Sequence, residues 1–294
     1  PDPRDKAEFT VYRIKLNEAE VALATLRAEH PKLADRTDVR RAELAIRFDS
    51  SYIRGDAEMS ALRETIARVL NDPEASRQLT ADAQYYLLNA DVRKLAVNQP
   101  AERRGENPPW LGRELDRRLR YARKYHDLKL GRRAYSETIL MRVQAFGYEK
   151  TRPLVEEFIK VYVDDRPAQA ELLSQVASVQ FRRYADGFKR ARPLIDRLLR
   201  QYGDQAITAQ SLSLMVLGRW ISSPKEAYAL LQRLTKRFPG NESVANVWSQ
   251  LVLDAYRKRQ LDAVDARLTM LARHFKTSAA RARALAAVAV EECR

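Results

Sequence analysis

The feature that most constrains the fold is an amphipathic segment that recurs along the chain at a nearly fixed interval. Each copy ends on one bulky residue and is followed by polar or turn-forming residues. Five copies align without gaps: ALRETIARVLNDP (61–73), TRPLVEEFIKVYVDD (151–165), ARPLIDRLLRQYGDQ (191–205), AYALLQRLTKRFPGN (227–241) and VDARLTMLARHFKTS (264–278). Two weaker copies lie at 20–32 and 114–128. A helical pattern with a period of about 34–40 residues is typical of a solenoid built from helix pairs.

The residue that closes each copy serves as a reference position. The closing residues are His30, Leu70, Tyr125, Tyr162, Tyr202, Phe238 and Phe275. If they are structurally equivalent, they should be buried between successive helix pairs. We expect the ring of His30 to be half-buried in the same way, because it occupies the position that Tyr or Phe takes in the later copies.

Apolar spacing and helix breakers divide the chain into about seven antiparallel helix pairs. The predicted pairs are 4–16 with 18–30, 36–54 with 56–70, 80–97 with 110–126, 132–146 with 149–162, 167–185 with 189–202, 205–220 with 224–238, and 241–258 with 260–275. A last, alanine-rich helix at 278–292 would cap the open end of the array, whose final apolar face otherwise lies in water. The sequence therefore predicts one all-α domain, 1–294, folded as a right-handed α-solenoid.

One interval in the series is longer than the others. Leu70 and Tyr125 are 55 residues apart, and the excess lies in the segment NQPAERRGENPPW (98–110). This segment is too polar and too rich in proline for a helix. Insertions in repeat arrays form loops on one face, which is often the binding face. A spacer stiffened as polyproline II by Pro108 and Pro109 fits the segment equally well.

Composition excludes several classes of protein. The 294 residues are 45% hydrophobic and 31% charged, which is ordinary for a folded chain, and nine glycines are too few for an all-β fold. No apolar run approaches the roughly 18 residues of a membrane span. The single cysteine, Cys293, excludes an intramolecular disulfide and a site with several thiolate ligands. The first residues, PDPRDKAEFT, lack an initiator Met and an apolar stretch, so we expect a processed product or a piece of a longer chain.

The repeats resemble the tetratricopeptide repeat. The best copy, 205–240, contains SPKEAYALLQRLTKRFPG, with Ala227 and Pro239 at that family's small and proline positions. Three residues match the family's pattern in the first helix: Leu217, Gly218 and Trp220. The units are longer than the family's and otherwise lack that pattern, so a HEAT-like or another α-solenoid stays open. Units that end in Phe-Pro-Gly-Asn or Tyr-Gly-Asp are similar to those of bacterial outer-membrane assembly lipoproteins, which implies a scaffold of the bacterial periplasm or envelope.

The chain carries no motif for catalysis or cofactor binding. The three histidines, His30, His126 and His274, stand in no metal-ligand spacing with one another. No phosphate-binding loop, nucleophile elbow or dinucleotide fingerprint occurs in the sequence. We therefore predict a protein that is not an enzyme, with no catalytic residue, no cofactor and no metal.

The clearest indication of a binding surface is a stripe of basic residues. Arg113, Arg117, Arg120 and Lys124 are spaced by 4, 3 and 4 along one predicted helix, so they share a face, opposite Leu115 and Leu119. Arg118 adds charge nearby, and Glu114 and Asp116 neutralise part of it. With the neighbouring aromatic residues and two arginines of the insertion, the predicted partner-binding residues are Arg103, Arg104, Trp110, Arg113, Arg117, Arg120, Tyr121 and Lys124.

The formal net charge of +14 calls for an acidic partner or a role in solubility. The basic stripe fits an acidic protein or peptide, anionic lipid headgroups, a phosphate backbone with stacked bases, or a solvated outer face. Our first hypothesis is a noncatalytic scaffold that binds a protein or peptide, acidic in character, through its concave face and this basic patch. The alternatives are a helical-repeat protein that binds nucleic acid, and the regulatory arm of an enzyme whose catalytic domain lies outside this chain. The partner's identity and the oligomeric state stay open.

Overall fold

The structure is a computed structural model in which residues 3–97, 107–183, 186–219 and 224–292 are described. These residues form fourteen α-helices and one short 3₁₀-helix, Pro31–Leu33, with no strand among them. Helices adjacent in the chain pack in pairs, which confirms the prediction of an all-α helical-repeat fold. The hand of the superhelix stays a prediction.

The chain divides into two compact units, Pro1–Thr138 (unit 1) and Ile139–Arg294 (unit 2). The division falls inside helix α6 (Lys129–Phe146) rather than in a loop. Each unit contains buried leucine, isoleucine and valine side chains of its own. The prediction of one domain over 1–294 stays a prediction.

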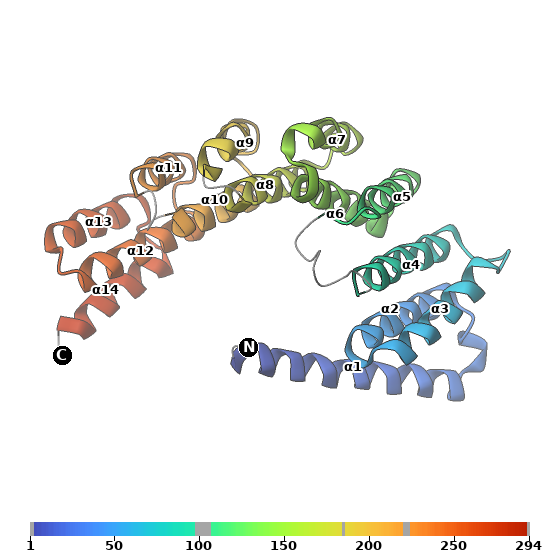
Figure 1. Ribbon diagram of the computed structural model, residues 1–294. Coiled ribbons are helices and arrows are strands. Elements are labelled where there is room, and N and C mark those ends of the chain that lie inside the picture. Colours follow the sequence, from blue (N-terminus) through green and yellow to red (C-terminus); the bar gives the residue numbers. More distant parts are fainter. Residues whose placement is uncertain (1–2, 98–106, 184–185, 220–223, 293–294) are drawn as a thin grey trace. The chain divides into compact units, whose positions relative to one another are not determined.

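Unit 1 is built from helices that lie along the first part of the chain (Figure 1). They are α1 (Pro3–Glu29), α2 (Thr37–Arg54), α3 (Asp56–Leu70), α4 (Arg77–Val97) and α5 (Leu111–Lys124), followed by the start of α6. Helix α2 packs on α1, α3 and α4, and α4 packs on α3 and α5. Gly55 reverses the chain between α2 and α3 with a φ of 87°, which glycine adopts without strain. The core of α2, α3 and α4 contains Leu44, Leu62, Ile66, Val69, Leu79, Ala83 and Ala90.

The first predicted helix pair is wrong. Residues 4–16 and 18–30 belong to one helix, α1, which is 27 residues long. The chain between the two predicted helices contains no Gly or Pro, so nothing ends the first one. Helix α1 packs on α2, and because it has no paired helix, His30 at its end is exposed instead of half-buried. The described array is therefore one single helix, six pairs and a capping helix.

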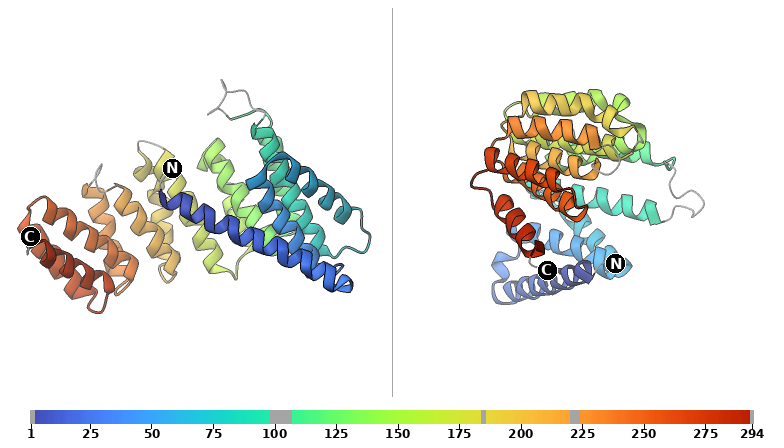
Figure 2. Two further views of the ribbon diagram at one scale, coloured as in Figure 1. Left: turned by 90° about the horizontal axis from the view of Figure 1, so that it is seen from below. Right: turned by 90° about the vertical axis from the view of Figure 1, so that its left-hand side faces the viewer.

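Unit 2 is a stack of helices in two layers. After α6 come α7 (Tyr148–Val161), α8 (Arg166–Arg183), α9 (Gly187–Gln201), α10 (Ala206–Arg219), α11 (Pro224–Arg237), α12 (Glu242–Arg257), α13 (Leu261–His274) and α14 (Ala279–Glu292). Helices α8, α10, α12 and α14 pack on one another in chain order, and α7, α9, α11 and α13 form the other row (Figure 1). Two further views show the same stacking (Figure 2). Helix α14 covers the last pair by packing on α12 and α13, as predicted for the cap.

The closing residues occupy equivalent positions in the structure. Five of them directly follow the second helix of a pair and donate their backbone N–H to the carbonyl four residues earlier: Tyr125, Tyr162, Tyr202, Phe238 and Phe275. Four of these side chains are buried, as expected, while Tyr162 and also Leu70 are half-buried. The repeat in the sequence therefore corresponds to a repeat in the structure.

Candidate binding pocket on unit 1

Helix α5 carries the predicted basic stripe on one face and its apolar residues on the opposite face, as predicted. Leu115, Leu119 and Ala122 are buried. On the other side, Arg113, Arg120 and Lys124 are exposed. Half-buried Trp110 occupies the N-cap position of α5. The two arginines predicted from the insertion, Arg103 and Arg104, lie outside the described residues.

The stripe borders a pocket of about 340 Å³ in unit 1. Helices α3, α4 and α5 line it with Leu70, Gln84, Leu87, Leu88, Arg117, Arg120, Tyr121 and Lys124. We call this cavity the α5 pocket. The side chains from α3 and α4 are mainly apolar, whereas α5 contributes three cations and one tyrosine. A volume of this size lies in the range of small-molecule sites and accommodates one large apolar side chain of a partner.

Arg117 is held in place by carboxylates of unit 1. Its Nη1 donates to Oδ2 of Asp91 at 2.6 Å, and it also lies 3.6 Å from the carboxylate of Glu114. The other oxygen of Asp91 accepts from Arg63 at 2.8 Å. The charge of Arg117 is therefore compensated within the protein, and the ion pair fixes the position of its guanidinium at the pocket.

Arg120 and Lys124 are the cations of the α5 pocket that an anionic partner meets first. Both side chains are exposed, and within the described part of the chain neither has a carboxylate at ion-pair distance. The ammonium of Lys124 lies 5.0 Å from the centre of the Tyr125 ring, which holds it in a cation–π contact. Lys124 lies seven positions after Arg117 on α5, so the three cations extend along about 10 Å of the pocket wall.

Tyr121 lines the α5 pocket but is not a surface aromatic residue. Its side chain is buried, and its hydroxyl donates to the carbonyl oxygen of Ala81 at 3.0 Å. Burial raises the pKa of this hydroxyl far above its ordinary value. The ring of Tyr121 therefore presents no exposed face on which a base could stack, because packing against α4 covers it.

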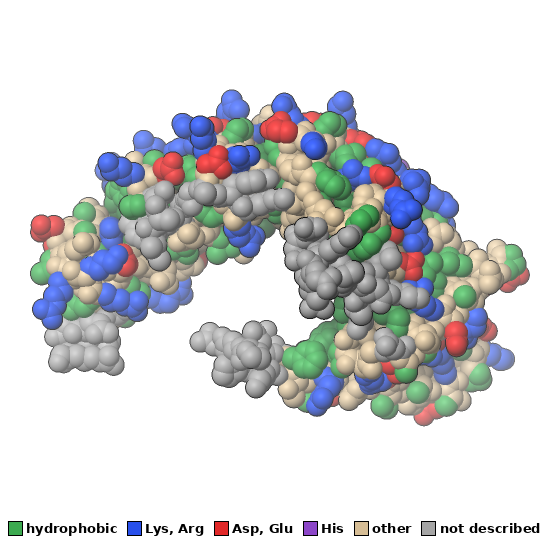
Figure 3. Space-filling model, viewed as in Figure 1, with side chains coloured by type: hydrophobic (Ala, Val, Ile, Leu, Met, Phe, Trp, Pro, Cys, Tyr) green, Lys and Arg blue, Asp and Glu red, His purple; other side chains and the backbone are tan. Residues whose placement is uncertain are grey.

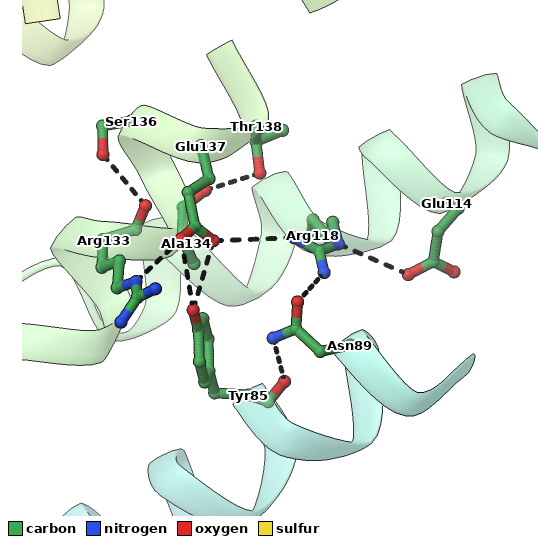
Figure 4. Close-up of polar contacts among 9 residues, drawn as sticks. All are labelled: Tyr85, Asn89, Glu114, Arg118, Arg133, Ala134, Ser136, Glu137 and Thr138. Atoms are coloured by element: carbon green, nitrogen blue, oxygen red, sulfur yellow. Dashed lines mark hydrogen bonds and ion pairs between the residues drawn. The ribbon is translucent and has the colours of Figure 1, made fainter. Parts of the chain in front are cut away.

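Beneath the stripe, a buried polar network connects α4, α5 and α6 (Figure 4). Arg118 is only 3% exposed, so it adds no charge to the surface, contrary to the prediction. Its guanidinium donates to the side-chain oxygen of Asn89 and lies 3.9 Å from the carboxylates of Glu114 and Glu137. Glu137 also accepts from Tyr85 at 3.2 Å and from Arg133 at 2.7 Å. The network fixes the rotation of α5 about its axis and so determines which side chains border the pocket.

Glu114 is the member of this network whose burial is unfavourable for the stability of the fold. Its side chain is buried, and one carboxylate oxygen accepts no hydrogen bond from the described residues. Desolvation raises the pKa of Glu114, although Arg117 and Arg118 oppose that shift. Glu114 neutralises part of the stripe through Arg117, as predicted, but it does so from a buried position and not from the surface.

Sequence reasoning missed the apolar half of the pocket. Leu70, Leu87 and Leu88 belong to ordinary amphipathic patterns, and nothing in their spacing separates a pocket wall from a helix contact. The binding of a partner by the predicted residues, and by the concave face, stays a prediction.

Two other kinds of site, a metal centre and a membrane span, have no counterpart among the described residues. They include no group of three or more His, Cys, Asp and Glu side chains able to hold a metal ion. No helix in the same residues combines the length and apolar character needed to cross a bilayer. Comparison of the chain with protein-family models, with curated proteins and with solved structures gave no match.

Proposed function

We propose that this chain is a noncatalytic binding scaffold whose α5 pocket receives a peptide segment of a partner protein. The segment would insert an apolar side chain between α4 and α5 and place carboxylates near Arg120 and Lys124. One observation carries the proposal: a mainly apolar wall from α3 and α4 and a row of cations from α5 line the same pocket.

In the expected mechanism, the apolar side of the pocket provides most of the affinity and the cations orient the bound peptide. Burial of one large apolar side chain contributes about 1.5–3 kcal/mol. The cations accelerate encounter with an acidic segment and fix its register more than they add affinity. Because Arg117 and Arg118 are held by Asp91 and Asn89, the wall formed by α5 needs little ordering when a partner binds.

The aromatic residues of α5 favour a peptide over a nucleic acid at this pocket. A pocket that holds a base of a nucleic acid needs an exposed ring on which that base can stack. Tyr121 and Tyr125 are both buried. The basic stripe alone would therefore recognise carboxylates as well as phosphates. The apolar side chains that α3 and α4 contribute to the pocket additionally suit an apolar side chain of a peptide.

The finer assignments are proposals of the same kind. We propose that the repeats are of tetratricopeptide type on the resemblance of 205–240 to that motif, and that the protein works in the bacterial periplasm or envelope on the resemblance of its unit endings. A regulatory arm of an enzyme fits the same fold and would use the same pocket.

Binding of defined peptides tests the proposal. The probe is a fluorescein-labelled peptide rich in Asp and Glu with one central Phe, compared with the same peptide carrying Ser at that position. The wild-type protein should bind the Phe peptide at least about tenfold more tightly, which corresponds to about 1.4 kcal/mol. The double variant Arg120→Glu with Lys124→Glu should lose most of this binding.

A matched control removes the effect of total charge. Arg13 and Lys15 are exposed on α1 and do not line the α5 pocket. Arg13→Glu with Lys15→Glu changes the net charge by the same amount and should leave affinity for the Phe peptide within about twofold. Equal losses in both double variants would mean that the peptide is attracted by net charge alone, and the proposal would be abandoned.

A further inference from the structure

A second basic feature follows the repeat register of unit 2. The residue two positions before the closing residue is basic in each of the four helices of the outer row. All four side chains are exposed: Lys160 on α7, Arg200 on α9, Lys236 on α11 and Arg273 on α13. We call these four residues the cation ladder. The ladder does not include any residue of the α5 pocket.

The four helices of the outer row are near neighbours. Arg197 of α9 donates to Glu156 of α7 at 2.6 Å, and Arg233 of α11 donates to Asp196 of α9 at 2.7 Å. An arginine side chain therefore spans the gap between α7 and α9 and the gap between α9 and α11, so successive rungs there are near enough for one flexible polyanion to contact both. Figure 3 shows Lys and Arg side chains along this outer edge of unit 2.

The ladder residues take no part in the ion pairs between helices, although Lys160 lies one turn after Glu156 and, behind Arg197, helps to lower the pKa of that carboxyl. Arg197 and Arg233, in the same outer row, are held by carboxylates of the preceding helix. In contrast, none of the four ladder residues forms an ion pair or hydrogen bond with another described side chain. Exposed cations without partners repel one another along the row, so the arrangement favours an anion that contacts several rungs.

The helix dipole explains only part of this pattern. Each ladder residue lies in the last turn of its helix, where a cation is favourable. The next residue is also in or directly beside the last turn, yet it is Val161, Gln201, Arg237 or His274. A dipole effect alone would favour basic residues at both positions, whereas only one register position is basic in all four helices.

We propose that the cation ladder binds the backbone of a single-stranded nucleic acid. One cation per helix forms a line, and a flexible polyanion can follow a line across several repeats. A membrane needs a broad basic patch, whereas the ladder is a single line with one cation from each helix. Since the ladder offers charges rather than groups that recognise base edges, binding should not depend on base sequence.

Salt titration of a charge-matched pair of variants tests the proposal. The probe is fluorescein-labelled oligothymidylate, and the ladder variant carries Lys160→Gln, Arg200→Gln, Lys236→Gln and Arg273→Gln. The control removes four other exposed cations of unit 2 that lie off the ladder: Arg152→Gln, Arg192→Gln, Lys225→Gln and Arg257→Gln. Circular dichroism verifies that both variants keep the helical content of the wild type.

The ladder variant should bind the probe at least about tenfold more weakly than the control at the same salt concentration. Its slope of log K against log salt should be smaller in magnitude by about 3, because each phosphate that a cation neutralises accounts for roughly 0.7 of the slope. Equal weakening in the two variants would overturn the proposal in favour of nonspecific attraction by net charge. Absence of wild-type binding to the probe would also overturn it, as would binding to anionic phosphatidylserine vesicles that is abolished only in the ladder variant.

Discussion

Arg166 closes its helix pair by donating to the carboxylate of Asp204 at 2.8 Å. Its guanidinium also donates to the carbonyl of Gln201 and lies 5.5 Å from the centre of the Tyr202 ring. Arg77 repeats the arrangement in unit 1, where its partners are the carboxylate of Asp127, the carbonyl of Lys124 and the ring of Tyr125. In both units an arginine that begins the first helix of a pair contacts the residues at which the second helix ends.

The Arg77–Asp127 clamp predicts a stability change in acid. The hydrogen bond from Arg77 lowers the pKa of Asp127 to about 2. A carboxyl whose pKa is lowered in the folded state stabilises the fold above its unfolded pKa, and this contribution is lost as the pH falls through the folded pKa. Urea unfolding should therefore show wild type more stable than Asp127→Asn at about pH 6, with the difference shrinking below about pH 4 and lost near pH 1. A difference that is as large at about pH 1 as at pH 6 would contradict this account.

The repeat register predicts the cost of removing a closing residue. Phe238 directly follows α11 and is 8% exposed. Phe238→Ala should lower the free energy of unfolding by about 3–5 kcal/mol, because it removes a large buried ring and leaves a cavity. Leu214 on α10 is 64% exposed, so Leu214→Ala should cost less than about 1 kcal/mol. Chemical denaturation of both variants makes the comparison, and similar costs would mean that the closing position is not part of the core.

The sequence predicts the secondary structure of this chain well because glycine and proline mark most helix ends. Gly55 and Gly147 separate helices where the pattern places breaks, and both have a φ of 87°. The prediction is wrong for α1, because no Gly or Pro separates its two amphipathic segments. A Gly or Pro in the local sequence indicates where a helix ends. Helix α1 continues because its middle contains neither.

The candidate site is less predictable because it depends on contacts distant in sequence. Arg118 looks like one more surface cation, but it is buried by Asn89, 29 residues earlier, and by Glu137, 19 residues later. Arg113 and Arg118 have equal charge and lie on the same helix, yet one is exposed and the other is not. The spacing of α5 establishes which residues share a face, whereas the packing of α4 and α6 determines which face is covered.

The buried network predicts opposite effects for two of its members. Arg118→Ala should lower the free energy of unfolding by about 1–3 kcal/mol, because it leaves the side-chain oxygen of Asn89 without its donor and removes one of the two cations near Glu114. Burial raises the pKa of Glu114, so its ionised form destabilises the fold at neutral pH. Glu114→Gln should therefore be more stable than wild type at about pH 7.

The pH dependence of Glu114→Gln provides the check. A carboxyl with a raised pKa in the folded state stabilises the fold below its unfolded pKa, and this contribution is lost as the pH rises through the folded pKa. The advantage of Glu114→Gln over wild type should therefore shrink as the pH falls towards about 4. Urea unfolding at several pH values measures it, and an advantage that grows in acid would exclude this explanation.

A variant that fills the α5 pocket should show what its apolar side chains contribute to peptide binding, separately from its cations. Gln84 lines the pocket from α4 and is half-buried, so Gln84→Trp places a bulky ring in the cavity without changing the net charge. This variant should lose the preference for the Phe peptide over the Ser peptide, while the weaker binding that remains keeps its dependence on salt. Arg120→Glu with Lys124→Glu should show the reverse, with little salt dependence left. Gln210→Trp, at an exposed position of α10, is the control for an added tryptophan and should bind both peptides as wild type does. If Gln84→Trp and Gln210→Trp bind the two peptides equally well, the apolar side chains of the pocket do not contribute to binding, and the cations of α5 act alone.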